Sequence, residues 1–243
     1  MGTVGWLAAT GCKLITGDPN RIIALEISGT TQQSVEENDT LALSARALAA
    51  NGDVVSGSSI TWAVVDTGNV GFALDPATGR VAAVTPGKSG RVQAQVEDLR
   101  SDPVTIAVTP APDSAAITGA PRVTLPASTA VSPPLTVSVF DLTTTPGAAL
   151  LLAGKPVVFQ VTAPPASGNQ PYFLVQTPID TVVPADLNRL TSTTAVGGQA
   201  NAYVRRRPGD GPPDSLTVRA TVATARGAPV TGSPFTFVVV FTN

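Results

Sequence analysis

The sequence predicts an all-β protein made of two tandem β-sandwich domains. Glycine and proline contribute 22 residues each among 243, and both residue types break helices and build turns. Valine and threonine, which favour strands, are abundant, whereas charged residues make up only 13%. Trp62 lies in the middle of a strand-like run at 59–65, where we expect its side chain to face the core. A turn signal at 75–79 and a second short strand that ends in Pro86-Gly87 follow it.

Alternation of apolar and polar residues places the strands of the first half. In residues 39–48 the apolar positions recur with a period of two and would line one face of a single strand; they are Leu41, Leu43, Ala45 and Ala47. Further strands are expected at 21–28, 59–65, 71–74, 80–84, 90–97 and 104–109. This spacing of strands and turns is typical of a sandwich.

A proline-rich stretch divides the chain. We expect an apolar leader and tether at 1–20, a first domain at 21–110, a semi-rigid linker at 111–121 and a second domain at 122–243. Strands of the second domain are expected at 122–125, 135–141, 156–162, 172–176, 188–194, 200–206, 216–224 and 236–241. The last run is apolar on both faces, which predicts a central or covered strand. Long loops are expected at 163–170 and 178–186, and loops are where sandwiches usually carry function.

Both halves resemble known bacterial domains. Residues 21–109 resemble the immunoglobulin-like domains of intimin-type surface proteins, through Ile60-Thr61-Trp62, Gly79-Arg80-Val81 and Thr85-Pro86-Gly87. Residues 122–243 resemble the invasin-type repeat, through the runs 155–159 and 199–204. The resemblance implies immunoglobulin-like sandwiches and a location in the cell envelope, and it implies no particular ligand.

The first twelve residues are apolar and uncharged. They are too short to span a bilayer and lack the basic start of a secretory signal. Small residues leading into Cys12 resemble the signal of a bacterial lipoprotein, which implies that Cys12 carries a lipid; the alternative is a free thiol near the terminus. We expect the leader to contact a membrane or its proteins through four apolar side chains: Trp6, Leu7, Leu14 and Ile15.

The composition argues against most chemistry. The chain has no histidine and one cysteine, so neither a histidine-based triad nor an internal disulfide nor a cysteine-based zinc site can form. The net charge of −2 and the lack of a long basic run argue against nucleic-acid binding. We therefore expect no enzyme activity, no cofactor and no metal. The alternatives left open are paired carboxylates for glycosidase chemistry and a structural calcium held by carboxylates of Asp66, Asp75, Asp180 and Asp186.

Two clusters in the second half are candidate partner contacts. Arg205, Arg206 and Arg207 form the one basic run, which could bind lipid phosphate or an acidic partner, or form a solvated rim. Tyr172 and Phe173 follow Gln170-Pro171 and either contact a partner or pack beneath a loop.

These observations predict a non-enzymatic structural subunit. It would be anchored on the periplasmic or outer face of a membrane and would bridge integral membrane proteins of a larger envelope complex, which could be photosynthetic, respiratory or secretory. The alternative is a surface adhesin or polysaccharide-binding module. An enzyme that uses Asp180 or Asp186 is the third reading.

Overall fold

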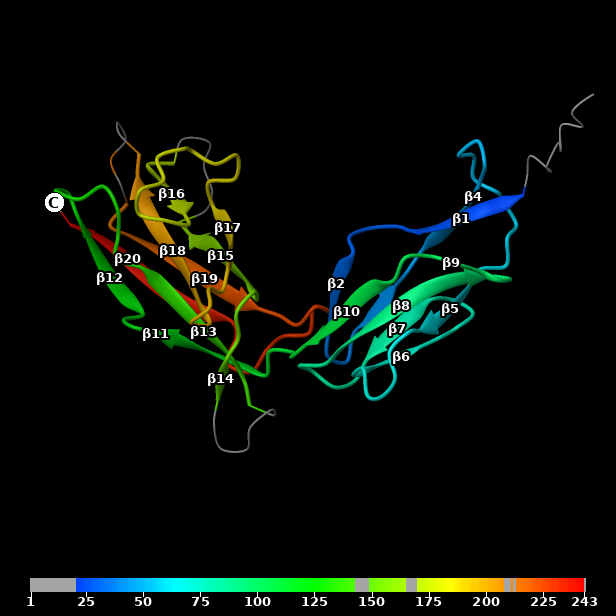
Figure 1. Ribbon diagram of the computed structural model, residues 1–243. Coiled ribbons are helices and arrows are strands. Elements are labelled where there is room, and N and C mark those ends of the chain that lie inside the picture. Colours follow the sequence, from blue (N-terminus) through cyan, green and yellow to red (C-terminus); the bar gives the residue numbers. More distant parts are fainter. Residues whose placement is uncertain (1–20, 143–148, 165–169, 208–210, 212, 243) are drawn as a thin grey trace, which may run out of the picture. The chain divides into compact units, whose positions relative to one another are not determined.

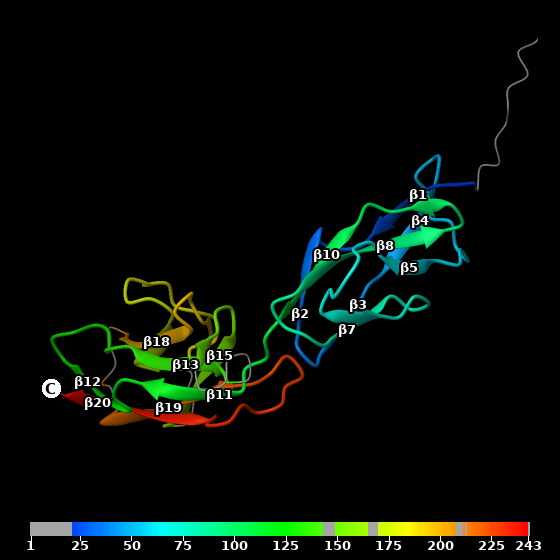
Figure 2. The same ribbon diagram turned by 60° about the horizontal axis from the view of Figure 1, so that its bottom comes forward.

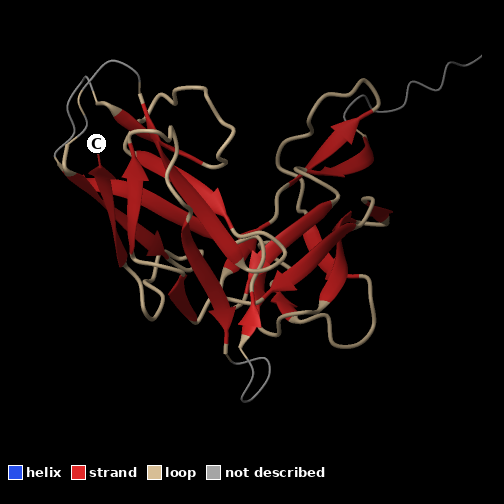
Figure 3. Ribbon diagram, turned by 90° about the vertical axis from the view of Figure 1, so that its left-hand side faces the viewer, coloured by secondary structure: helices blue, strands red, loops and turns tan. Residues whose placement is uncertain are grey.

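The computed structural model describes residues 21–142, 149–164, 170–207, 211 and 213–242. These residues form strands and loops and no helix (Figure 3). The chain divides into two compact units. Unit 1 takes residues up to Val35, Thr40–Val84 and Lys88–Ala107, and unit 2 takes Glu36–Asp39, Thr85–Gly87 and Val108–Asn243.

Unit 1 is built on three groups of paired strands (Figure 1). The largest sheet has the order β2-β10-β8-β5, with β9 paired to β8; a second has the order β3-β7-β6, and β1 pairs with β4. The strands are β1 (Ile22–Ile27), β2 (Gln32–Glu36), β3 (Thr40–Ala42), β4 (Ala45–Ala49), β5 (Thr61–Val64), β6 (Phe72–Leu74), β7 (Arg80–Ala83), β8 (Ser89–Val96), β9 (Leu99–Arg100) and β10 (Val104–Thr109).

Trp62 lies in the core of unit 1, as its position in the middle of a strand predicts. Its side chain is 6% exposed, and its backbone N–H donates to Pro76 O at 2.9 Å. The turn 75–79 brings Gly79 beneath the indole ring with a φ of +69°, a conformation that favours glycine. A Cβ on Gly79 would lie 2.5 Å from Trp62 Cε2, so the ring occupies the space that a side chain would need.

The prediction of a single strand at 39–48 is wrong. The segment forms two strands in different sheets, because β3 pairs with β7 whereas β4 pairs with β1. Leu43, between them, is 6% exposed and donates its N–H to Gly79 O at 3.1 Å. The period of two continues through the change of sheet, so alternation alone could not reveal it.

Unit 2 is a sandwich of two five-stranded sheets. The β13 sheet has the order β11-β13-β18-β16, with β14 paired to β13, and the β20 sheet has the order β12-β20-β19-β15-β17 (Figure 2). The strands are β11 (Ser114–Thr118), β12 (Arg122–Pro126), β13 (Leu135–Asp141), β14 (Leu150–Leu151), β15 (Pro156–Ala163), β16 (Tyr172–Val175), β17 (Arg189–Thr193), β18 (Gln199–Arg206), β19 (Ser215–Val222) and β20 (Phe235–Thr242).

Two expectations for unit 2 have different outcomes. The apolar run near the C-terminus forms β20, which lies between β12 and β19, and its prediction as a central strand is confirmed. The expected linker 111–121 contains β11, which pairs with β13 from Ser114↔Phe140 to Thr118↔Thr136. Its residues therefore belong to a sheet rather than to a spacer.

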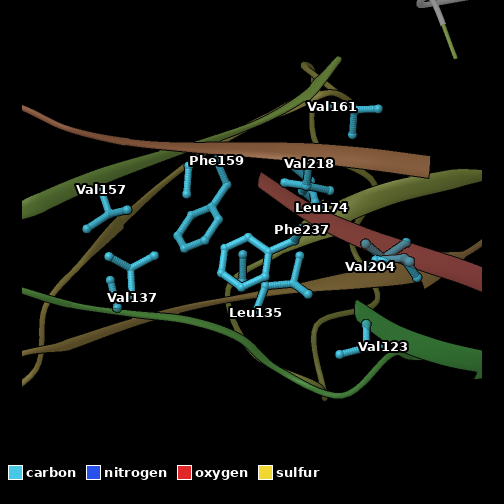
Figure 4. Packing of buried hydrophobic residues seen from close by; sticks show 14 of the residues in the cluster. Val123, Leu135, Val137, Val157, Phe159, Val161, Leu174, Val204, Val218 and Phe237 are labelled. Atoms are coloured by element: carbon cyan, nitrogen blue, oxygen red, sulfur yellow. The ribbon is translucent and has the colours of Figure 1, made fainter. Parts of the chain in front are cut away.

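The core of unit 2 lies between the inner faces of its two sheets (Figure 4). Phe159 on β15 and Phe237 on β20 are fully buried, with ring centroids 6.4 Å apart. Leu135 and Val137 on β13 belong to the same cluster and are also fully buried. In the β20 sheet, β19 and β15 alternate buried residues with more exposed ones. The arrangement is an all-β, immunoglobulin-like sandwich, the class that the sequence predicts.

Replacing Gly79 tests the contact with Trp62. Gly79→Ala should lower the free energy of unfolding by about 3 kcal/mol, because left-handed strain and overpacking against the indole add together. Gly52→Ala is the matched control: its φ is +86°, and no atom lies within 4 Å of the added Cβ. It should lose only about 1 kcal/mol from backbone strain. Equal losses in urea unfolding would contradict the contact.

Candidate functional site

The loop 176–188 joins β16 of one sheet to β17 of the other and is drawn in yellow tones in Figure 1. Hydrogen bonds fix it at both ends. Thr177 N donates to Asp180 Oδ2 at 3.0 Å, and Asp180 N donates to Thr177 O at 3.2 Å. At the far end Leu174 N donates to Leu187 O at 3.2 Å. The loop therefore has a defined local structure.

Arg205 ties the same loop to the neighbouring strand. It lies on β18, in register with Phe173 on β16, and its Nη2 donates to Pro178 O at 2.8 Å. A charged donor makes a stronger hydrogen bond than a neutral one, so this contact holds the beginning of the loop against the sheet.

The loop presents aliphatic side chains to solvent. Ile179 is 81% exposed, Val182 is 82% exposed and Val183 is 46% exposed. We call these three residues the apolar loop surface. Single exposed apolar residues are common, but several on one anchored loop are a typical feature of a protein contact. The sequence pointed to this loop by its length; its two flanking prolines around an aliphatic run were the further signal.

The basic run 205–207 has mainly an internal role. Besides Arg205, Arg206 donates from Nη2 to Leu125 O at 2.7 Å and to Thr242 O at 3.3 Å. Its guanidinium carbon also lies 5.2 Å from the centroid of the Phe241 ring. Arg207 N donates to Pro171 O at 2.8 Å, and its side chain is half-buried. Two of the three arginines expected to meet a partner thus bind carbonyl groups of their own unit.

Tyr172 and Phe173 are not surface contacts. Both lie on β16, a strand in which every residue is buried, and they are 1% and 2% exposed. Tyr172 also packs near Phe241, with ring centroids 6.3 Å apart. Tyr172 belongs to the core cluster of unit 2 and Phe173 is buried as well, so the prediction that they are exposed partner contacts is wrong.

The candidate contacts of the leader lie outside the described residues. These are Trp6, Leu7, Leu14 and Ile15, together with the lipid-attachment candidate Cys12. Lipidation and leader docking remain predictions from the sequence.

The carboxylates considered for calcium each have a local partner. Asp66 binds the Arg91 guanidinium, with Oδ1 2.6 Å from Nη2, and this hydrogen bond lowers the pKa of Asp66. The Thr78 hydroxyl lowers the pKa of Asp75 within the turn 75–79. Asp180 and Asp186 each accept a backbone N–H in the loop 176–188. Among the residues that the structure describes, no three or more metal-ligating side chains come together.

Within the described part of the chain, no helix has the length and hydropathy of a membrane span.

Neither a protein-family model nor a curated protein matches this sequence. Among solved structures, the chain is similar to the Yersinia pseudotuberculosis adhesin InvE, with a TM-score of 0.41, 18% identity and coverage of 90% of this chain and 58% of that one. It is also similar to the fibronectin(III)-like modules of Clostridium thermocellum CbhA, with a TM-score of 0.39, 11% identity and coverage of 90% and 94%. For the Escherichia coli adhesin FdeC the TM-score is 0.37, the identity 15% and the coverage 89% and 64%. The chain thus spans less than two thirds of the length of either adhesin structure.

The role of Arg205 can be tested by hydrogen exchange. Arg205→Met keeps the aliphatic stem but removes the bond to Pro178 O, so amides of residues 176–188 should exchange about tenfold faster. Arg207→Met is the control, since it removes the same charge two residues along the chain. Mass spectrometry of peptides that cover the loop measures the difference. Equal exchange in both variants would contradict the anchoring role.

The burial of Tyr172 predicts a loss of stability at alkaline pH. Burial raises the pKa of the Tyr172 phenol above its usual value of 10.0. The stability gained from the neutral phenol is present below the unfolded pKa and is lost as the pH rises through the folded pKa. Thermal unfolding between about pH 9 and about pH 12 should show this loss in the wild type and in Tyr203→Phe, and less of it in Tyr172→Phe. An identical pH profile for all three proteins would count against the burial of Tyr172.

Proposed function

We propose that this chain is a non-enzymatic structural subunit of the bacterial cell envelope, which binds a larger assembly of membrane proteins through its immunoglobulin-like units. The observation that carries the proposal is the apolar loop surface, Ile179, Val182 and Val183, on a loop that hydrogen bonds hold in place. The envelope location and the membrane-protein partners rest on the leader and on the family resemblance of the sequence.

The chemistry of the loop favours a protein partner. Aliphatic side chains have no hydrogen-bonding groups, so their favourable contribution on binding comes from removing apolar area from water. Ile179 and Val182 are each more than four-fifths exposed and lose little rotamer freedom on binding, because both are β-branched. Pre-ordering of the loop by Arg205 further reduces the entropy lost on association.

A surface adhesin or polysaccharide-binding module is the second candidate. It is favoured by a separate feature, the cationic outer face of the β20 sheet, which is described in the next subsection.

Crosslinking from the loop tests the proposal directly. A photo-reactive residue in place of Val182 should crosslink, in native membranes, to integral membrane proteins that also co-purify in fixed stoichiometry in mild detergent. The same residue in place of Val196 is the matched control, since Val196 is 94% exposed and lies in a different turn.

Substitution of the loop provides the complementary measurement. Ile179→Ser/Val182→Ser should reduce co-purification of the partner about tenfold or more, because two largely exposed aliphatic side chains no longer lose water contact on binding. Val196→Ser should bind as the wild type does, and thermal unfolding should show that all variants stay folded. Full retention of the partner by the double variant would refute the loop as the contact.

A further inference from the structure

The outer face of the β20 sheet carries cations and no carboxylate. Its five strands, β12, β20, β19, β15 and β17, contain arginines at 122, 189 and 219 and neither aspartate nor glutamate. All three arginines are exposed. The whole chain has a net charge of −2, so the charge of this face is opposite in sign to that of the chain.

Two of these arginines lie in one row across the sheet. Gln160 on β15 is the register partner of Arg219 on β19 and of Arg189 on β17, and the three residues are exposed on the same face. Since neighbouring strands lie about 4.8 Å apart, the Cα atoms of the two arginines are about 10 Å apart, with the amide of Gln160 between them.

The side chains of this row are available to a ligand. No hydrogen bond or ion pair in the described part of the chain engages the side chain of Arg189, Gln160 or Arg219. The nearest carboxylates along the chain, Asp186 and Asp214, lie outside the strands; Asp186 accepts Asn188 N. The two guanidinium groups repel each other weakly in water, where the Debye length is about 8 Å, and an anion bound between them offsets that repulsion.

A shallow depression borders the row. Its volume is about 320 Å³, and it is lined by Gln160 and Arg189 together with Pro156, Val158, Thr221 and Thr224. Val158 pairs with Thr221 on one side and with Thr191 on the other, so the next row of the face offers two hydroxyl groups around an aliphatic side chain. A hydroxyl both donates and accepts hydrogen bonds, as the Gln160 amide also does.

We propose that this face binds an acidic polysaccharide. Arg189 and Arg219 bind its carboxylates, and Gln160, Thr191 and Thr221 form hydrogen bonds with its hydroxyl groups. A guanidinium matches a carboxylate in geometry and charge, and the neighbouring groups match a ligand rich in hydroxyls. No outward residue of the five strands is aromatic, so recognition rests on charge and hydrogen bonds rather than on ring stacking.

The direction of the row favours this ligand over an acidic peptide. A peptide that paired with the edge strand β17 would run along that strand and pass only Arg189. A polyanion that lies across the strands meets both arginines. The inference rests on the second candidate function, the polysaccharide-binding module, and names its ligand class; it does not depend on the loop 176–188.

Binding of the full chain to polygalacturonate tests the inference. At low ionic strength the wild type should bind polygalacturonate, should not bind the neutral polymer dextran, and should lose affinity as salt is added. Arg189→Gln/Arg219→Gln should bind about tenfold more weakly, since two exposed charge contacts are lost. Arg21→Gln/Arg100→Gln, which removes two exposed charges from unit 1, should bind as the wild type does.

A single added negative charge separates a loss of binding from a loss of the fold. Gln160→Glu places a carboxylate between the two guanidinium groups, where it can pair with them, so the fold should be kept while polygalacturonate binding is lost. Ile179→Ser/Val182→Ser should still bind polygalacturonate, which separates this site from the loop. Binding that is absent, that is unaffected by the row variants, or that is found for poly-glutamate instead of polygalacturonate would overturn the proposal.

Discussion

The contact between the inner faces of the two sheets is the constraint on which unit 2 depends. Phe159 and Phe237 come from neighbouring parts of the β20 sheet, and both rings are fully buried against side chains of the β13 sheet. Because side chains of β15 point alternately to the two faces of its sheet, burying one face of this strand sends the intervening residues outward. The cationic row is therefore a product of the same register that builds the core: Val161 and Phe159 point inward, and Gln160 between them points outward.

Arginine closes the sandwich where the sheets end. Arg206 binds the carbonyl of Leu125 on β12 and that of Thr242 on β20, and Arg205 binds the carbonyl of Pro178 in the loop. Strand ends leave carbonyl groups without ladder partners, and a guanidinium with five donors can satisfy several of them at once. Carbonyl binding thus accounts for Arg205 and Arg206, and the Arg205 contact also holds the loop that presents the apolar loop surface.

Alternation and turn residues were sufficient to predict the class of fold and most of the strands, including the central position of β20. The predictions failed where the same local sequence pattern is compatible with two different structures. Residues 39–48 keep a period of two while they pass from one sheet to another, and residues 114–118 form β11 within a proline-rich stretch that resembles a spacer. The candidate site was less predictable, because it depends on pairs far apart in sequence. Arg205 and Pro178 are 27 residues apart in the sequence, and only the fold brings them into contact. The alignment of Arg219 with Arg189 depends likewise on the register of three strands.

The two proposed surfaces of unit 2 differ in the physics of binding, and this difference allows both to act in one protein. The apolar loop surface gains affinity from removing Ile179 and Val182 from water, a contribution that added salt does not weaken. The arginine row gains affinity from charge, which salt screens. A contact of the first kind suits lasting attachment to a protein assembly, whereas one of the second kind suits reversible contact with a charged polymer. The side chains of Asp180 and Arg205, which hold the loop, do not belong to the arginine row, so the two surfaces rely on different side chains.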